Sequence, residues 1–207
     1  MGLAHHARSD RSGERLVGTS RKIWAQFHKY NMRRSNPCEK VLNVHNVGEL
    51  SLKWSYATGS YVQSSPAVAN GVVYVGSLDN NVYALNASTG AKLWSYATRQ
   101  PVFSSPAVAN GVVYVGSDNQ NVYALNAKTG AKLWRHYAGS YPSSPAVANG
   151  VVYFGSEDSN VYALNAKTGA KLWSYTTGND VISSPAVANG VVYVGSEDGY
   201  VYAFGLK

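Results

Sequence analysis

The sequence has 207 residues, of which 45% are apolar and 14% are charged. This length suits one domain or two small ones, and the apolar fraction excludes a wholly disordered chain. No apolar run approaches the roughly 18–20 residues that a membrane-spanning helix needs, which argues against an integral membrane protein. The single cysteine, Cys38, leaves no internal disulfide framework and no zinc site built on several cysteines. The 20 glycines and 16 tyrosines favour many short, tightly turned strands.

The positive charge is concentrated near the N-terminus. Of a formal net charge of +7, residues 1–49 carry nine Lys/Arg against four Asp/Glu. Residues 1–22 mix Arg, Ser, Gly and His without apolar periodicity, which predicts a disordered basic leader rather than a nucleic-acid-binding arm. His5 and His6 in this leader are only a weak metal-binding signal. The leader also lacks the apolar stretch of a secretory signal peptide, so the sequence as given does not indicate export.

An internal repeat of about 40 residues organises the rest of the chain. The repeated text is SSPAVANGVVYVGS followed by NVYALNAxTGAKLW, and the third copy is one residue shorter between Trp134 and Pro145. We therefore divide the chain into the leader, a lead-in segment at 23–49, a strand at 50–57, and repeats at 58–97, 98–137, 138–176 and 177–207. The repeat recurs at its tryptophans and prolines: Trp54, Trp94, Trp134 and Trp173, and Pro66, Pro106, Pro145 and Pro185.

Each copy divides into four short antiparallel strands, predicted in the first copy at 64–69, 72–76, 81–86 and 91–96. The Asn70-Gly71 pair is a strong hairpin signal, because both residues tolerate a positive φ. Proline cannot donate a ladder hydrogen bond, so the first strand belongs at one edge of the sheet, and the lysine-bearing fourth strand belongs at the other. Four-stranded sheets repeated at this period predict an all-β fold, a β-propeller, with the proline strand lining the channel.

The stretch from Ala84 to Trp94 resembles the tryptophan-docking motif A-x-D-x-x-T-G-x-x-x-W of quinoprotein (PQQ-like) propeller repeats. It recurs at Ala124–Trp134 and Ala163–Trp173, with Asn where the motif prefers Asp. The resemblance implies that each tryptophan packs between adjacent blades and against a glycine turn, so the motif residues are structural. WD40 repeats are the competing family, but here Ser or Arg follows each Trp. The implied structural residues are Trp54, Trp94, Trp134, Trp173, Gly90, Gly130 and Gly169.

The last copy contains three predicted strands, and the segment from Leu50 to Tyr56 has Trp54 in the frame of a fourth. We therefore expect the N-terminal strand to complete the last blade. Two closures satisfy this arrangement: a single chain could form a four-bladed ring, or two chains could join head to tail by strand exchange into an eight-bladed homodimer. The resemblance favours the dimer, because quinoprotein-type blades are associated with seven- and eight-bladed rings.

Differences between the copies gather in two sets of loops, which an up-and-down blade places on the same face of the ring. One set precedes each first strand and the other joins the second strand to the third. We expect a ligand to bind on this face. The alternative is that these loop sequences vary only because the fold does not constrain them. Its aspartates would form a ring of carboxylates for a cation or a basic peptide, unless they are ordinary turn formers. The candidate ligand-face residues are Tyr61, Asp79, Arg99, Asp118, Tyr141, Glu157, Asp158, Asp180, Glu197 and Asp198.

No catalytic constellation is evident in the sequence. Quinone dehydrogenases with this repeat use a vicinal cysteine pair, calcium and an acidic base, whereas Cys38 is alone and lies outside the blades. We therefore predict no catalytic residue, no metal site, and neither PQQ nor calcium as cofactor. The expected function is a non-catalytic binding scaffold for a protein, peptide or saccharide. The alternatives are a relative or fragment of a PQQ-dependent dehydrogenase and an outer-membrane assembly-type scaffold, and the resemblance is to a mostly periplasmic or extracellular family.

Overall fold

The computed structural model describes residues 39–206, which form four antiparallel sheets preceded by a short 3-10 helix, η1 (Val47–Glu49). The first three sheets have four strands each and the fourth has three, each in simple sequence order. The predicted all-β fold of repeated four-stranded sheets is confirmed. The strands of the first two sheets are β1 (Ala67–Ala69), β2 (Val72–Gly76), β3 (Asn81–Asn86), β4 (Lys92–Ala97), β5 (Ala107–Ala109), β6 (Val112–Ser117), β7 (Asn121–Asn126) and β8 (Lys132–Tyr137). Those of the third and fourth are β9 (Ala146–Ala148), β10 (Val151–Gly155), β11 (Asn160–Asn165), β12 (Lys171–Thr176), β13 (Ala186–Ala188), β14 (Val191–Gly195) and β15 (Val201–Gly205).

Local sequence accounts for the turns and for the strand order within each sheet. The β1–β2 hairpin has Asn70 at φ 51° and Gly71 at φ 76°, as the Asn-Gly signal predicts. Pro66 immediately precedes β1, which is a short edge strand, and β4 is the opposite edge. The side-chain oxygen of Asn86 accepts hydrogen bonds from the backbone N–H groups of Ser88 and Thr89, at 2.9 and 3.1 Å, and so closes the turn before β4. Asparagine thus replaces the aspartate of the motif without loss of the turn.

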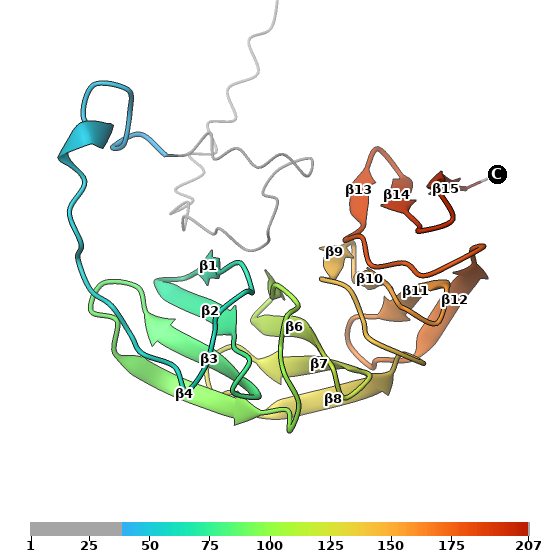
Figure 1. The fold of residues 1–207 in the computed structure, drawn as a ribbon, viewed down its shortest axis with the longest axis horizontal. Coiled ribbons are helices and arrows are strands. Elements are labelled where there is room, and N and C mark those ends of the chain that lie inside the picture. Colours follow the sequence, from blue (N-terminus) through green and yellow to red (C-terminus); the bar gives the residue numbers. More distant parts are fainter. Residues whose placement is uncertain (1–38, 207) are drawn as a thin grey trace, which may run out of the picture.

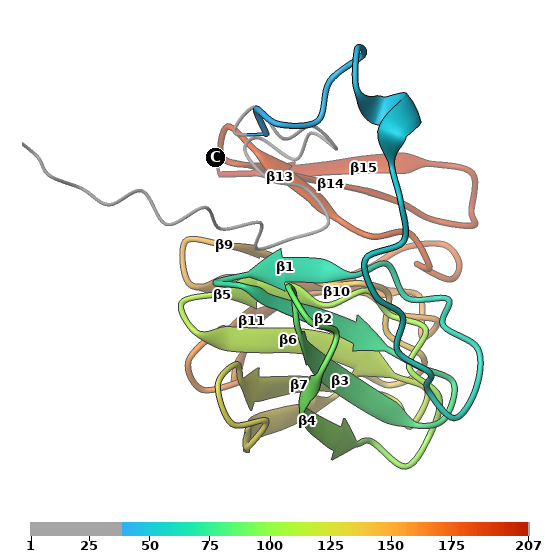
Figure 2. The same cartoon turned by 90° about the vertical axis from the view of Figure 1, so that its left-hand side faces the viewer.

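The four sheets follow one another around an open arc (Figure 1). The short first strands lie on the inner side of the arc, where β1 contacts β5, β5 contacts β9, and β9 contacts β13. The tryptophan-bearing strands β4, β8 and β12 lie on the outer side. Viewed from the side, the sheets stack face to face (Figure 2). The predicted order, with the proline strand innermost, is confirmed.

The hydrophobic core lies between successive sheets rather than in one central mass. Val82 from the first sheet and Val102, Val113 and Val115 from the second are all fully buried in one cluster. A corresponding cluster joins the second sheet to the third, around Phe154. Each sheet is therefore stabilised mainly by its neighbours, as expected of a repeat architecture.

The first two junctions between sheets repeat one tryptophan contact. The indole N–H of Trp94 donates to the carbonyl oxygen of Ala127 at 3.0 Å, and its ring covers Gly130. A Cβ atom added to Gly130 would lie 2.8 Å from that ring, and the residue has φ +72°. Trp134 makes the same contact with the third sheet. Trp94 and Trp134 thus make the contacts that the resemblance implies, whereas Trp173 covers no glycine among residues 39–206.

Trp54 docks in the predicted frame, but it does not close the ring within one chain. Its indole N–H donates to the carbonyl oxygen of Ala87 at 3.0 Å, and its ring covers Gly90. Residues 50–57 nevertheless form no strand, and the β13–β14–β15 sheet remains three-stranded. The expectation that this segment completes the last sheet is therefore wrong for a single chain. The physical reason is that the docked segment and β15 lie at opposite ends of the arc (Figure 1).

Some sequence predictions fall outside residues 39–206. The basic leader with His5 and His6, most of the lead-in segment and Cys38 are among them. Within the part that the structure describes, no helix is long and apolar enough to cross a bilayer.

Candidate functional site

The two sets of variable loops meet at one end of every sheet, as predicted. In each sheet a backbone N–H at the start of the loop between the second and third strands donates to a carbonyl oxygen of the loop before the first strand. We call the surface that these paired loops form the loop face. The pairs are Leu78 with Tyr61, Asp118 with Pro101, Glu157 with Tyr141, and Glu197 with Asp180, at 2.9, 3.0, 3.2 and 2.8 Å.

Three of the carboxylates predicted to form a ring accept hydrogen bonds from residues of their own sheets. The carboxylate of Asp79 accepts hydrogen bonds from the hydroxyl of Tyr83 at 2.6 Å and from the backbone N–H groups of Gly59 and Asn81 at 2.7 and 3.1 Å. Burial raises the pKa of Asp79, but these hydrogen bonds outweigh it and hold the pKa below its ordinary value. Burial and the Asp79 carboxylate together raise the pKa of Tyr83 to about 12. The same tyrosine bond recurs from Tyr162 to Asp158 and from Tyr202 to Asp198.

Of the expected ring of Asp79, Asp118, Asp158 and Asp198, only three members hold equivalent positions. In the second sheet the position equivalent to Asp79 is held by Asn119, which bonds to the Tyr123 hydroxyl at 2.6 Å, and Asp118 is its neighbour. The alternative, that aspartates here are turn formers, is confirmed for Asp79, Asp158 and Asp198, because a short side chain can cap its own loop.

Because Asn119 holds this position naturally, Asp79→Asn is expected to be tolerated. We expect it to lower the free energy of unfolding by less than about 1 kcal/mol, whereas Asp79→Ala leaves the buried Tyr83 hydroxyl without a partner and costs about 1–3 kcal/mol. Urea denaturation followed by tryptophan fluorescence measures both. Equal losses for the two variants would contradict the capping role.

The other carboxylates of the loop face accept no hydrogen bond from any residue in the range 39–206 that the structure describes. Asp118, Glu157 and Glu197 share one position, two residues after the last glycine of the second strand, which Leu78 holds in the first sheet. Within residues 39–206, neither Asp118 nor Glu157 accepts a hydrogen bond through its carboxylate. Burial raises the pKa of Asp118, and burial followed by the charges of Asp180, Asp118 and Glu197 raises the pKa of Glu157. These four carboxylates therefore form one electrostatic cluster.

A cavity of about 410 Å³ opens on the loop face beside two of these carboxylates. Asp118 and Glu157 line it together with Phe103, Tyr141 and Ile182, whose side chains are 44%, 45% and 56% exposed. Phe103 and Ile182 hold equivalent positions, three residues before the repeat proline, in the second and fourth copies. The third copy, which lies between these two copies in the sequence, is one residue shorter. Its missing residue belongs to the stretch of sequence between Phe103 and Ile182. The cavity, which we call the hollow, is thus lined by the loop of the third copy that contains the deletion.

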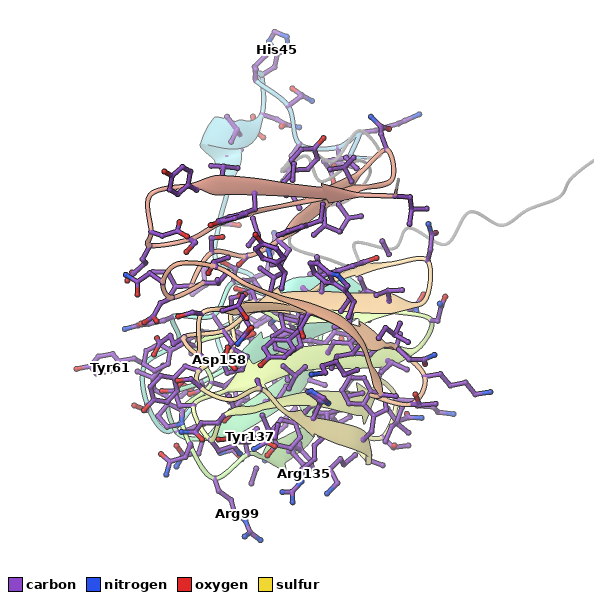
Figure 3. All side chains as sticks on the ribbon, turned by 90° about the vertical axis from the view of Figure 1, so that its right-hand side faces the viewer. His45, Tyr61, Arg99, Arg135, Tyr137 and Asp158 are labelled. Atoms are coloured by element: carbon purple, nitrogen blue, oxygen red, sulfur yellow. The ribbon has the colours of Figure 1, made fainter. Side chains whose placement is uncertain are left out.

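The remaining predicted residues lie outside the hollow. Tyr61 is 78% exposed, and both Tyr61 and Arg99 point away from the body of the protein, whereas Asp158 points into it (Figure 3). Arg99 lines a separate cavity of about 440 Å³ with Arg135. Sequence reasoning missed Phe103 and Ile182 as wall residues, although the one-residue deletion between them was a usable signal.

The described residues do not fit the quinone cofactor of the dehydrogenases that share this repeat. A vicinal cysteine pair cannot form in a chain with one cysteine. Among residues 39–206, no group of three or more His, Cys, Asp and Glu side chains is arranged to hold a metal ion. We therefore derive no chemical step through a quinone or a metal.

Comparison with solved structures shows the same fold in natural and designed proteins. BamB from Moraxella catarrhalis superposes with a TM-score of 0.68 at 23% identity, over 74% of this chain and 49% of that one. The quinohemoprotein alcohol dehydrogenase from Comamonas testosteroni gives 0.69 at 22% identity, over 76% of this chain and 32% of that one. The computationally designed Ika4 protein gives 0.65 at 19% identity, over 73% of this chain and 94% of that one. The chain thus matches about half of BamB and about a third of the dehydrogenase.

No curated protein matches the sequence. The family model described as outer membrane protein assembly factor BamB, a PQQ-like repeat model, matches residues 18–146 and 138–207. These two matches cover most of the chain, and they agree with the repeated sheets, the docked indoles and the glycine turns. The chain belongs to this family of PQQ-like β-propeller repeat proteins.

Proposed function

We propose that this chain is a non-catalytic binding module that holds a protein or peptide segment on its loop face. The observation that carries the proposal is the hollow, which combines apolar walls with free carboxylates. Phe103 and Ile182 offer apolar contact in the hollow, and Asp118 and Glu157 offer negative charge. The ligand chemistry that fits is a basic side chain flanked by apolar ones.

Electrostatics support a cationic ligand in particular. Burial, followed by the charges of Asp180, Asp118 and Glu197, raises the pKa of Glu157, and a bound cation would relieve the repulsion among these carboxylates. Binding should therefore weaken as the pH falls and Glu157 becomes protonated. The family's description as an outer membrane protein assembly factor supports a scaffold role, in which the module holds a segment of another protein.

Calorimetric titration with an acetylated hexapeptide of alternating arginine and leucine tests this proposal. We expect binding at low salt that weakens with added salt, and none of the matched glutamate–leucine peptide. Glu157→Gln should weaken binding by about fivefold or more. The control is Asp158→Asn, which removes the same charge from the adjacent residue but from a carboxylate bonded to Tyr162, and should change affinity by less than about twofold.

Two outcomes would overturn the proposed ligand class. One is an equal loss in Glu157→Gln and Asp158→Asn, which would mean that only the overall field matters. The other is no binding of the arginine peptide by the unmodified chain at any salt concentration. A rise in melting temperature on adding pyrroloquinoline quinone with calcium would instead support the dehydrogenase alternative.

A further inference from the structure

Successive sheets interlock through a small set of repeated contacts. At the junction of the first two sheets, Val102 fills the space over Gly76, where a Cβ atom would lie 2.4 Å from its side chain. The hydroxyl of Tyr74 donates to the carbonyl oxygen of Ala127 at 3.0 Å, and that oxygen also accepts from Trp94. Equivalent contacts at the next junction are Pro142 over Gly116, and Tyr114 and Trp134 on the carbonyl of Ala166.

The fourth sheet carries the residues that make the first half of these contacts, and no other part of residues 39–206 covers them. We call this surface of β14 and β15 the trailing face. Tyr193 is 42% exposed there, whereas Tyr74 at the equivalent position is 3% exposed. A Cβ atom added to Gly195 would meet only Ser183 of its own sheet. Val201 is 80% exposed, although its equivalents Val82, Val122 and Val161 are each 0% exposed.

The first sheet carries the groups that make the other half of these contacts, namely Val62 and the carbonyl oxygen of Ala87. We call this surface the leading face. Val62 is 49% exposed, whereas Val102 and Val181, which cover the glycines of the preceding sheets, are 0% exposed. The carbonyl oxygen of Ala87 accepts from Trp54, and its equivalents in the second and third sheets accept from a tyrosine as well. Val62 and the Ala87 carbonyl thus match Gly195 and Tyr193 of the trailing face.

The backbone edges match in the same way. In the first sheet β3 pairs with β4 through Val82 opposite Tyr96, Tyr83 opposite Ser95 and Ala84 opposite Trp94. The repeat places Tyr56, Ser55 and Trp54 where β4 has Tyr96, Ser95 and Trp94. It therefore predicts the pairs Val201 with Tyr56, Tyr202 with Ser55, and Ala203 with Trp54.

An apolar groove beside the fourth sheet is consistent with this register. A cavity of about 910 Å³ lies between the third and fourth sheets, lined in part by Trp173, Phe204 and Leu206. Trp173 is 38% exposed, whereas Trp134, which docks on a turn, is 9% exposed. In each of the first three sheets, the turn that receives a tryptophan from the preceding segment lies three to eight residues before that sheet's own tryptophan. The equivalent residues before Trp54 are 46–51, where η1 makes a turn.

We propose that two copies of this chain join head to tail, leading face on trailing face at both ends, into one closed ring. Residues 52–57 of each copy become the fourth strand beside β15 of the other, and residues 46–51 fill the groove at Trp173. The same 3.0 Å indole bond holds Trp54, Trp94 and Trp134, which argues for one preferred angle between sheets. Closing a single chain would require a larger angle at each junction, because its two faces lie at opposite ends of the arc (Figure 1). A cyclic dimer leaves no unpaired sheet edge.

Light scattering during size-exclusion chromatography of the 207-residue protein tests the stoichiometry. We expect twice the 22.2 kDa of one chain, independent of loading over a wide concentration range. A species of one chain, or a series of larger assemblies, overturns the closed dimer.

Cysteine cross-linking tests the register and distinguishes closure between chains from closure within one. In a Cys38→Ser background, Ala57→Cys combined with Tyr200→Cys places two thiols at positions that the repeat sets opposite each other, as Ala97 is opposite Asn81. Mild oxidation should give a covalent dimer on non-reducing gels, and either single variant should give none through this bond. A monomer cross-linked within itself, or no cross-link at all, contradicts the proposal.

A matched pair of surface variants tests the trailing face itself. Val201→Lys places a charge where the partner strand would cover it and should weaken dimerisation by about tenfold or more. Leu133→Lys is the control, because Leu133 is 51% exposed on the outer strand β8, away from both end faces. Circular dichroism should show the same β-structure in both variants. Equal stoichiometry for the two would overturn the assignment of this face.

Discussion

Replacing Trp134 by alanine is expected to lower the free energy of unfolding by about 3–5 kcal/mol. The Trp134 side chain is 9% exposed and lies in the cluster that joins the second sheet to the third. Its ring covers Gly169, and its indole N–H bonds to the carbonyl oxygen of Ala166 at 3.0 Å. The variant loses this packing and leaves a cavity between two sheets. Equilibrium denaturation in urea, followed by circular dichroism, measures the loss.

Leu133 provides the control for the tryptophan variant. It precedes Trp134 on the same strand but is 51% exposed, so Leu133→Ala is expected to cost less than about 1 kcal/mol. A loss of less than about 1.5 kcal/mol in Trp134→Ala would show that the indole does not hold the sheets together.

Gly130→Ala is expected to lower the free energy of unfolding by about 2–4 kcal/mol. Gly130 has φ +72°, a conformation that costs an L-residue about 1–2 kcal/mol by itself. The added methyl would also lie 2.8 Å from the Trp94 ring, so the indole must move away from its hydrogen bond to Ala127. Urea denaturation again gives the free energy.

Gly111→Ala separates the two causes. Gly111 has φ +76°, nearly the same as Gly130, but an added Cβ meets no atom within 4 Å. This variant should therefore show only the backbone cost of about 1–2 kcal/mol. If both variants lose the same stability, the close approach of the indole contributes nothing and the docking explanation fails.

Most of the architecture followed from local sequence. Asn70 and Gly71 set a hairpin because both accept a positive φ, and the prolines mark an edge strand because they cannot donate. The predicted ranges 72–76 and 81–86 agree with β2 and β3. The first and fourth strands were misplaced at their ends, since β1 begins only at Ala67 and β4 extends to Ala97. Edge strands end where their neighbours stop pairing, which a single repeat does not show.

The candidate site was less predictable, because residues of one type have two different roles. Asp118 and Asp158 both lie in the loop after a second strand. In the third sheet the side chain of Asp158 caps this loop, whereas in the second sheet Asn119 caps it and Asp118 does not. Only the hydrogen bonds to the tyrosines show which carboxylates are bound and which are free. The hollow likewise depends on how the sheets before and after the shortened copy approach each other.

The sequence by itself determined the repeated sheets, their strand order, the turns and the frame of the docking tryptophans, because each depends on the conformational limits of residues close together in the chain. Only the tertiary structure shows the open arc of the single chain, because the placement of successive sheets depends on contacts such as Trp94 on Gly130, between residues far apart in the sequence. It also decided which acidic side chains accept no hydrogen bond, because the partners available to a loop depend on which groups the adjoining strands place within hydrogen-bonding distance.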